Sequence, residues 1–149
     1  MREYFLRWLE HDGYPFWSFW DNVRSWWEVQ QTPNVLLLHY AQLKADLPRE
    51  VRRIAAFLGI EINPAREKTI LKHCSFEYMK THASTIAWVL EPILAGGAES
   101  FINKGTNGRW SDILTAEDIR RYEDVVRSKL GDACAEWLFT GQALGKEAV

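Results

Sequence analysis

The run Val35-Leu36-Leu37-Leu38-His39-Tyr40 decides the fold class that we predict for this chain. The run is short, continuous and apolar, and it follows a turn at Thr32-Pro33-Asn34. These features are typical of a strand that is buried on both faces, as in a parallel sheet. Because the segments on either side show helical spacing, we predict an α/β fold in which helices dominate.

A strand buried on both faces needs neighbours, because its backbone N–H and C=O groups must be hydrogen-bonded. The sequence contains no second convincing strand. Either the neighbouring strands come from elsewhere, or this strand lies at an exposed edge. We therefore expect the chain to be part of a domain, with an exposed strand edge for self-association or for a partner chain.

Capping residues and apolar spacing locate the helices around this strand. We expect helices over residues 1–12, 16–30, 47–58, 64–73, 75–82, 116–130 and 133–139. Their N-terminal signals are Asp46, Asn63-Pro64 and Thr115, the last with Asp118 three positions later as in a capping box. Gly59 and Gly131 follow the ends of two of them. Residues 83–99 are ambiguous, although residues 85–94 are compatible with a helix.

The composition indicates an ordinary globular protein of one domain. The chain has 149 residues, of which 47% are hydrophobic and 26% charged, and its formal net charge is -2. This balance argues against general nucleic-acid binding, which needs a basic surface to neutralise phosphates. Five of the eight tryptophans lie between Trp8 and Trp27, and we expect this segment to be packed inside an assembly.

The sequence also bears on location. No apolar run approaches the ~18 residues of a membrane helix, and the N-terminus lacks the apolar core of a signal peptide. Cys74 and Cys134 are too few for a disulfide framework, and no metal-ligand spacing surrounds them. We therefore predict a cytoplasmic protein that binds neither a membrane nor a metal.

The segment from Phe101 to Trp110 is the most informative for chemistry. Gly105 and Gly108 allow the backbone to approach a ligand and to point N–H groups at it. Lys104 and Arg109 add positive charge, so the segment is typical of an anion-binding loop. Spacing alone leaves a second interpretation open, a surface loop with scattered charges.

This loop resembles the Arg-Lys-Gly-x-x-Gly-Asp-Trp-Lys signature of the cytosolic sulfotransferases, which is kept at Lys104, Gly105, Gly108 and Trp110. Four other segments resemble the family in the same order, namely residues 17–27 with their paired Trp, 35–40, 49–59 and 73–79. The similarity is strongest over residues 17–115. It implies that residues 1–149 are a single partial sulfotransferase domain. That domain would be the mostly helical C-terminal portion of a P-loop-like parallel-sheet fold, with the N-terminal phosphosulfate-loop half absent.

The resemblance implies a function for the intact enzyme, the transfer of a sulfuryl group from 3'-phosphoadenosine 5'-phosphosulfate (PAPS) to a hydroxyl or amine of a small-molecule acceptor. This chain would supply the 3'-phosphate and adenine side of the nucleotide site. The implied binding residues are Tyr40, Cys74, Ser75, Phe76, Met79, Phe101, Ile102, Asn103, Lys104 and Gly105. No catalytic residue is assigned, and His11, His39, His73 and His82 are interpreted as structural.

Three departures from the family pattern bear on this site. Asn103 stands where the family usually has Arg, so the 3'-phosphate would be held less tightly. Arg109 stands where the family usually has Asp, and its charge would partly offset this loss. Cys74 replaces a Thr, which removes a hydroxyl donor. The chain alone is expected to be inactive, and two alternatives remain open: a non-catalytic nucleotide-binding or protein-interaction module derived from a sulfotransferase, or one half of a split enzyme.

Overall fold

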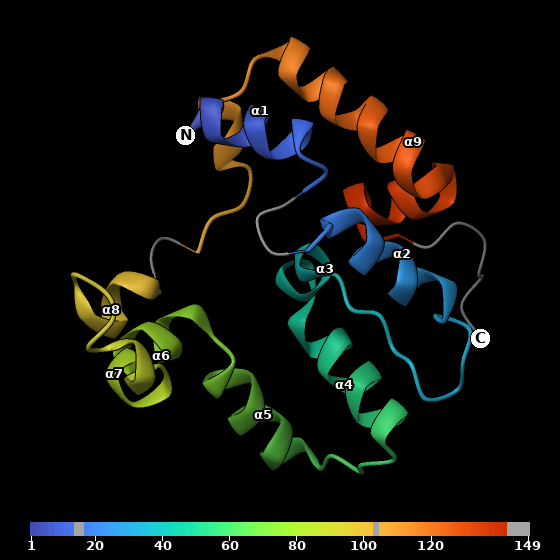
Figure 1. Ribbon diagram of the computed structural model, residues 1–149. Coiled ribbons are helices and arrows are strands. Elements are labelled where there is room, and N and C mark those ends of the chain that lie inside the picture. Colours follow the sequence, from blue (N-terminus) through green and yellow to red (C-terminus); the bar gives the residue numbers. More distant parts are fainter. Residues whose placement is uncertain (14–16, 103–104, 143–149) are drawn as a thin grey trace. The chain divides into compact units, whose positions relative to one another are not determined.

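The computed structural model describes residues 1–13, 17–102 and 105–142, which form helices joined by loops (Figure 1). The helices are α1 (Arg2–Glu10), α2 (Phe19–Glu28), α3 (Tyr40–Ala45), α4 (Leu47–Leu58), α5 (Pro64–His73), α6 (Phe76–Thr81), α7 (Ala83–Ile86), α8 (Gly97–Phe101) and α9 (Ala116–Thr140), with 3₁₀ helices η1 (Trp88–Leu90) and η2 (Arg109–Asp112). They divide into two compact units. Unit 1 comprises Met1–Ala45 and Gly108–Val149, and unit 2 comprises Asp46–Asn107.

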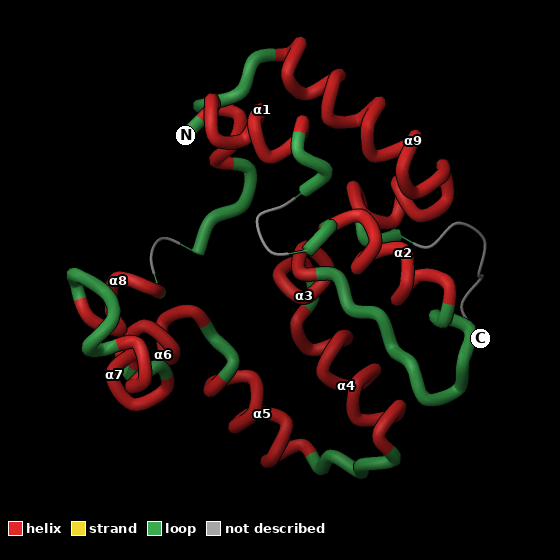
Figure 2. Tube along the Cα trace, in the orientation of Figure 1, coloured by secondary structure: helices red, strands yellow, loops and turns green. Residues whose placement is uncertain are grey.

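The predicted strand is not formed. Residues 35–39 run as an extended loop into α3, and Figure 2 shows helices and loops but no strand among the described residues. The parallel-sheet fold class is therefore wrong for the described part of the chain, and the expected strand edge is not formed either. The physical reason is pairing, since a strand exists only beside another strand that completes its hydrogen bonds.

Side chains at the end of this loop bind the C-terminal part of α9 instead. His39 donates from Nε2 to the carbonyl oxygen of Leu138 at 3.0 Å, and its Nδ1 accepts from the backbone N–H of Ala41 at 3.2 Å. Gln42 donates from Nε2 to the carbonyl oxygen of Thr140 at 2.9 Å. Both ring nitrogens of His39 are thus engaged, which supports its interpretation as a structural residue.

The core of unit 1 lies where α1 and α2 pack against α9 (Figure 1). Leu9, Trp20, Val126 and Ala135 are buried there, and half-buried aromatic side chains surround them. Trp20 is fully buried, and its indole N–H has no hydrogen-bond acceptor among the described residues. Burial of an aromatic side chain of this size stabilises the unit through the hydrophobic effect.

The tryptophans of the first segment are not all packed as expected. Trp8 and Trp27 are half-buried, whereas Trp17 is 69% exposed and Trp26 is also exposed. Helix α2 buries one stripe of its surface, on which Trp20 lies. Trp17 precedes the helix and Trp26 lies off that stripe, so neither is buried by the described part of this chain, and their packing inside an assembly stays a prediction.

The predicted capping signals are confirmed. The side chains of Asp46 and Asn63 accept the backbone N–H groups of the third residues of α4 and α5, at 3.0 and 2.9 Å. Thr115 and Asp118 form a reciprocal capping box at the start of α9. Gly59 ends α4 with a left-handed backbone. At Gly131 the backbone leaves the helical conformation, with φ 75° and ψ 164°, and the final helical segment follows.

Unit 2 contains α4 to α8, and its second half resolves the ambiguity over residues 83–99. This stretch is broken into α7, η1 and the start of α8 rather than forming one helix. Ala83, Ala87 and Ala98 form a small buried cluster, against which Leu90 and Ile102 pack. In neither unit does a described helix have the length and apolar character needed to cross a membrane.

Candidate functional site

The N-terminus of α6 positions the first group of candidate binding residues. The Oγ of Ser75 accepts the backbone N–H of Tyr78 at 3.1 Å, and this cap begins the helix at Phe76. Because the Ser75 hydroxyl is an acceptor in this bond, its own O–H can still donate to a ligand. Phe76 and Met79 follow on the same short helix, and both are half-buried.

The glycine loop contacts this helix through Gly105. Its backbone is left-handed, with φ +62°, and a Cβ built at this position would lie 2.5 Å from Cδ2 of Phe76. Only glycine can therefore bring the loop this close to the aromatic ring. Gly108 is also left-handed, with φ +80°, but a Cβ there would meet open space.

A positive charge lies over the ring of Phe76. The Nζ of Lys80 is 5.7 Å from the ring centroid, a distance typical of a cation–π contact. The sequence did not single out Lys80. The signal that could have found it is its spacing, since residues four apart on a helix lie on the same face.

Two histidines flank the ring of Tyr78 in the same region. The ring centroid of Tyr78 lies 4.4 Å from that of His73 and 3.9 Å from that of His82. The Nδ1 of His82 also lies 2.8 Å from the carbonyl oxygen of Tyr78. These contacts support a packing role for both histidines, as the sequence indicated.

The ten predicted binding residues fall into three groups. The first group lies in the second half of unit 2 and has seven members: Cys74, Ser75, Phe76, Met79, Phe101, Ile102 and Gly105. Gly105 contacts the ring of Phe76. Tyr40 begins α3 in unit 1, where it is 61% exposed, and the structure does not group it with the others. Asn103 and Lys104 lie outside the described residues.

The described residues contain no group of three or more His, Cys, Asp or Glu side chains arranged to hold a metal ion. Of the two cysteines, Cys74 is exposed and Cys134 is buried. Burial raises the pKa of the Cys134 thiol, so this side chain stays protonated and unreactive.

Residues 1–133 match the family model described as a sulfotransferase domain. The chain belongs to the sulfotransferase family. This sulfotransferase-family chain is 32% identical over 133 residues to human sulfotransferase 1C2, an alignment that covers 86% of the chain and 43% of the relative. It is 35% identical over 102 residues to guinea pig (Cavia porcellus) sulfotransferase 1E1, covering 68% of the chain and 34% of that relative.

A solved structure agrees with this assignment. The crystal structure of mouse sulfotransferase SULT7A1 complexed with PAP superimposes with a TM-score of 0.73 at 25% sequence identity. The match covers 94% of this sulfotransferase chain and 52% of the mouse chain. The chain therefore spans less than half the length of the curated relatives described above and about half of the mouse structure.

Proposed function

We propose that this chain supplies the adenine and 3'-phosphate side of the nucleotide site in a PAPS-dependent sulfotransferase. The observation that carries the proposal is the similarity of nearly the whole chain to a sulfotransferase structure that contains PAP. PAP is the desulfated nucleotide that sulfuryl transfer from PAPS leaves behind. The intact enzyme would act on a hydroxyl or amine of a small-molecule acceptor. We also propose that the two units are parts of one sulfotransferase domain.

The adenine would be bound at the start of α6. The Phe76 ring offers an aromatic face, Met79 adds an apolar surface, and the Ser75 hydroxyl retains a donor. Cys74 precedes the cap and is exposed. The family resemblance also implies that Tyr40 binds the adenine, and this role stays a prediction.

The 3'-phosphate would be bound by the glycine loop. A dianionic phosphate is suited to backbone N–H groups together with the point charge of a lysine. We assign these roles to Gly105 and Lys104, with Asn103, Phe101 and Ile102 beside them. The close approach of Gly105 to Phe76 supports this assignment, since it couples the phosphate loop to the adenine-binding helix.

The reaction would be an in-line displacement at sulfur. The acceptor oxygen or nitrogen forms a bond to sulfur, the bond from sulfur to the 5'-phosphate oxygen breaks, and PAP leaves. The acceptor also loses a proton to a base, and none of the described residues is assigned that role. In this chain the site binds and orients the nucleotide, which places the sulfuryl group for attack.

Calorimetric titration of PAP into the purified chain tests the proposal. We expect saturable binding, weakened about 10- to 150-fold by Lys104→Ala, because a hydrogen bond to a charged group contributes ~1.5–3 kcal/mol. Lys68→Ala is the matched control, since this exposed lysine lies on α5 in the same unit. Absence of binding in a sample that circular dichroism shows to be folded would contradict the proposal, as would equal effects of both substitutions.

A second candidate function is a non-catalytic protein-interaction module derived from a sulfotransferase, which Asn103 favours because it lacks the charge of the usual Arg at the phosphate site. The substitution Asn103→Arg distinguishes this candidate from the proposed nucleotide site. If the phosphate site is intact, the added guanidinium raises PAP affinity. If the site has degenerated, the substitution leaves the affinity unchanged.

A further inference from the structure

Helix α8 leads directly into the glycine loop, but its N-cap residue cannot cap it. The helix has only five residues, and helices this short are marginal unless their free backbone N–H groups are satisfied. The N-cap position is Gly96, which has no side chain to accept those groups. An acceptor for the start of α8 must therefore come from another part of the chain.

The carboxylate of Glu91 supplies this acceptor. Its Oε2 accepts the backbone N–H of Ala98, the second residue of α8, at 2.8 Å. The bond joins a charged acceptor to a backbone donor, and a negative charge is favoured at the N-terminus of a helix. Because Glu91 lies directly after η1, this bond fastens the turn at residues 92–96 onto α8.

Gly97 allows the carboxylate to lie this close to the helix. Its backbone is left-handed, with φ +62°. A Cβ built there would lie 2.9 Å from Oε1 of Glu91, closer than such atoms pack. Glycine therefore meets two requirements at this position, a backbone conformation that other residues rarely adopt and room for the carboxylate.

The other end of α8 carries residues of the proposed phosphate site. Ala98 is fully buried in a cluster with Ala83 and Ala87. Ile102 packs against the same cluster, and α8 ends at Phe101. A shift of α8 would therefore move Phe101 and Ile102 together. The carboxylate that fixes the start of the helix thereby fixes the residues that enter the glycine loop.

We infer that Glu91 is a positioning residue for the 3'-phosphate. Glu91 holds α8 in place without touching the nucleotide, and α8 holds the start of the glycine loop where the phosphate binds. The inference rests on the proposed function, because it requires PAP to bind at this loop. It deepens that function by assigning a role to a residue outside the loop signature.

Calorimetric titration of PAP into the purified chain and two Glu91 variants tests the inference. Glu91→Ala removes the acceptor and should weaken PAP binding about fivefold, the effect of losing a helix cap. Glu91→Gln keeps an amide oxygen that can accept the Ala98 N–H, so its affinity should stay within about twofold of the parent chain. Asn63→Ala is the matched control, because it removes the cap of α5 in the same unit and should leave PAP affinity unchanged.

A second ligand separates positioning from a general loss of stability. Adenosine 2',5'-bisphosphate has the charge of PAP, but its ribose phosphate is attached at the neighbouring carbon. The parent chain should prefer PAP, and Glu91→Ala should reduce this preference, because a displaced loop no longer distinguishes the two phosphate positions. A loss of stability alone would weaken both ligands equally and leave the preference unchanged.

The outcomes distinguish this inference from the proposed function. If the parent chain binds no PAP, the proposed function fails and the inference fails with it. If the parent chain binds PAP and Glu91→Ala binds it equally well, only the positioning role of Glu91 is overturned. That role is also overturned if Asn63→Ala weakens PAP as much as Glu91→Ala does, if Glu91→Gln gives no rescue, or if the preference for PAP is absent or unchanged.

Discussion

Arg2 and Asp118 form a two-pronged ion pair between the first residue of α1 and the first turn of α9. The Nε and Nη2 atoms of Arg2 donate to the two carboxylate oxygens of Asp118 at 2.6 and 2.9 Å. Asp118 is 4% exposed, and it also accepts the backbone N–H of Thr115 at 2.9 Å. One carboxylate therefore caps a helix and joins two elements that are 116 residues apart.

We expect Arg2→Gln to lower the midpoint of thermal unfolding by several degrees, because it leaves the Asp118 charge buried without its partner. Arg7→Gln, on the same helix, is the matched control. Arg7 pairs with Glu3 at 3.2 Å, but both side chains are largely exposed, so the pair stabilises the protein little. Equal shifts in a calorimetric scan would refute the importance of the Arg2 pair.

The ion pair also predicts a dependence on pH. Hydrogen bonds from Arg2 and Thr115 hold the pKa of Asp118 far below its ordinary value. The native state therefore binds fewer protons than the unfolded state in acid, and this contribution is lost as the pH falls below about 4. Urea titrations between neutral pH and pH ~2 should show a steeper loss of stability for the parent chain than for Asp118→Asn. If the free energy of unfolding of both proteins falls equally with pH, protonation of Asp118 is not coupled to unfolding.

Trp20 and Trp17 offer a direct test of the core. Trp20→Ala removes a fully buried side chain and should lower the free energy of unfolding by ~3–5 kcal/mol. Trp17→Ala removes an exposed one and should change it by no more than ~0.5 kcal/mol. Chemical denaturation measures both, and a large effect at Trp17 would indicate burial in an assembly.

Alanine substitutions at Gly105 and Gly108 distinguish the effect of backbone strain from that of a steric clash. Both have a left-handed backbone, so alanine at either position costs about 1–2 kcal/mol in strain. At Gly105 the new methyl group also meets the Phe76 ring, and the loop must move away from α6. We therefore expect Gly105→Ala to weaken PAP binding strongly and Gly108→Ala to weaken it less. The reverse order in titrations would place the nucleotide elsewhere.

Ser75 and Asn63 are helix caps of the same kind. Alanine at either position should lower the free energy of unfolding by about 1 kcal/mol. Ser75 begins the helix to which we assign the adenine, whereas Asn63 begins α5. Ser75→Ala should therefore also reduce PAP affinity, and Asn63→Ala should not. If both variants bind PAP like the parent chain, the start of α6 is not part of the site.

Local signals in the sequence predicted where most of the longer helices begin, although they missed α3 and α8. Asp46, Asn63 and Thr115 cap their helices as expected, because capping depends on a side chain and a backbone N–H only two or three residues away. The family assignment was also confirmed, because motifs that occur in the same order as in the family can be found in the sequence without knowing the fold. The strand at residues 35–40 was predicted wrongly, because strand formation depends on a partner strand that is distant in the sequence.

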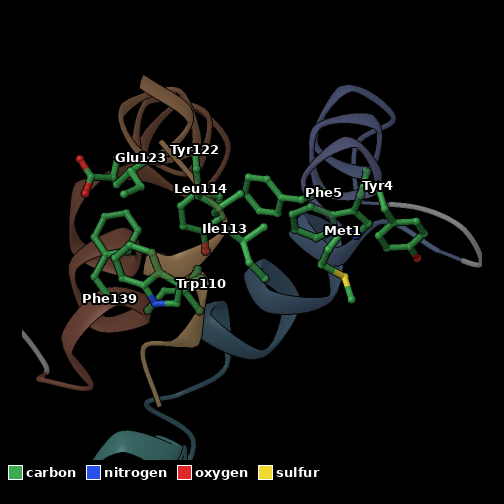
Figure 3. Close-up of a pocket in the computed structure, with 12 residues that line it drawn as sticks. Met1, Tyr4, Phe5, Trp110, Ile113, Leu114, Tyr122, Glu123 and Phe139 are labelled. Atoms are coloured by element: carbon green, nitrogen blue, oxygen red, sulfur yellow. The ribbon is translucent and has the colours of Figure 1, made fainter. Parts of the chain in front are cut away.

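Sequence patterns were enough to predict α1, α2, α4, α5, α6 and α9, three of the helix caps and the membership of the sulfotransferase family, but they missed α3 and α8. Three contacts could be seen only in the folded chain: Gly105 lies against Phe76, Arg2 pairs with Asp118, and rings from α1 and α9 line one cavity (Figure 3). The physical reason is the distance along the sequence over which each interaction acts. Backbone preference and capping act within a turn or two of helix, whereas burial and ion pairing depend on which distant elements pack together.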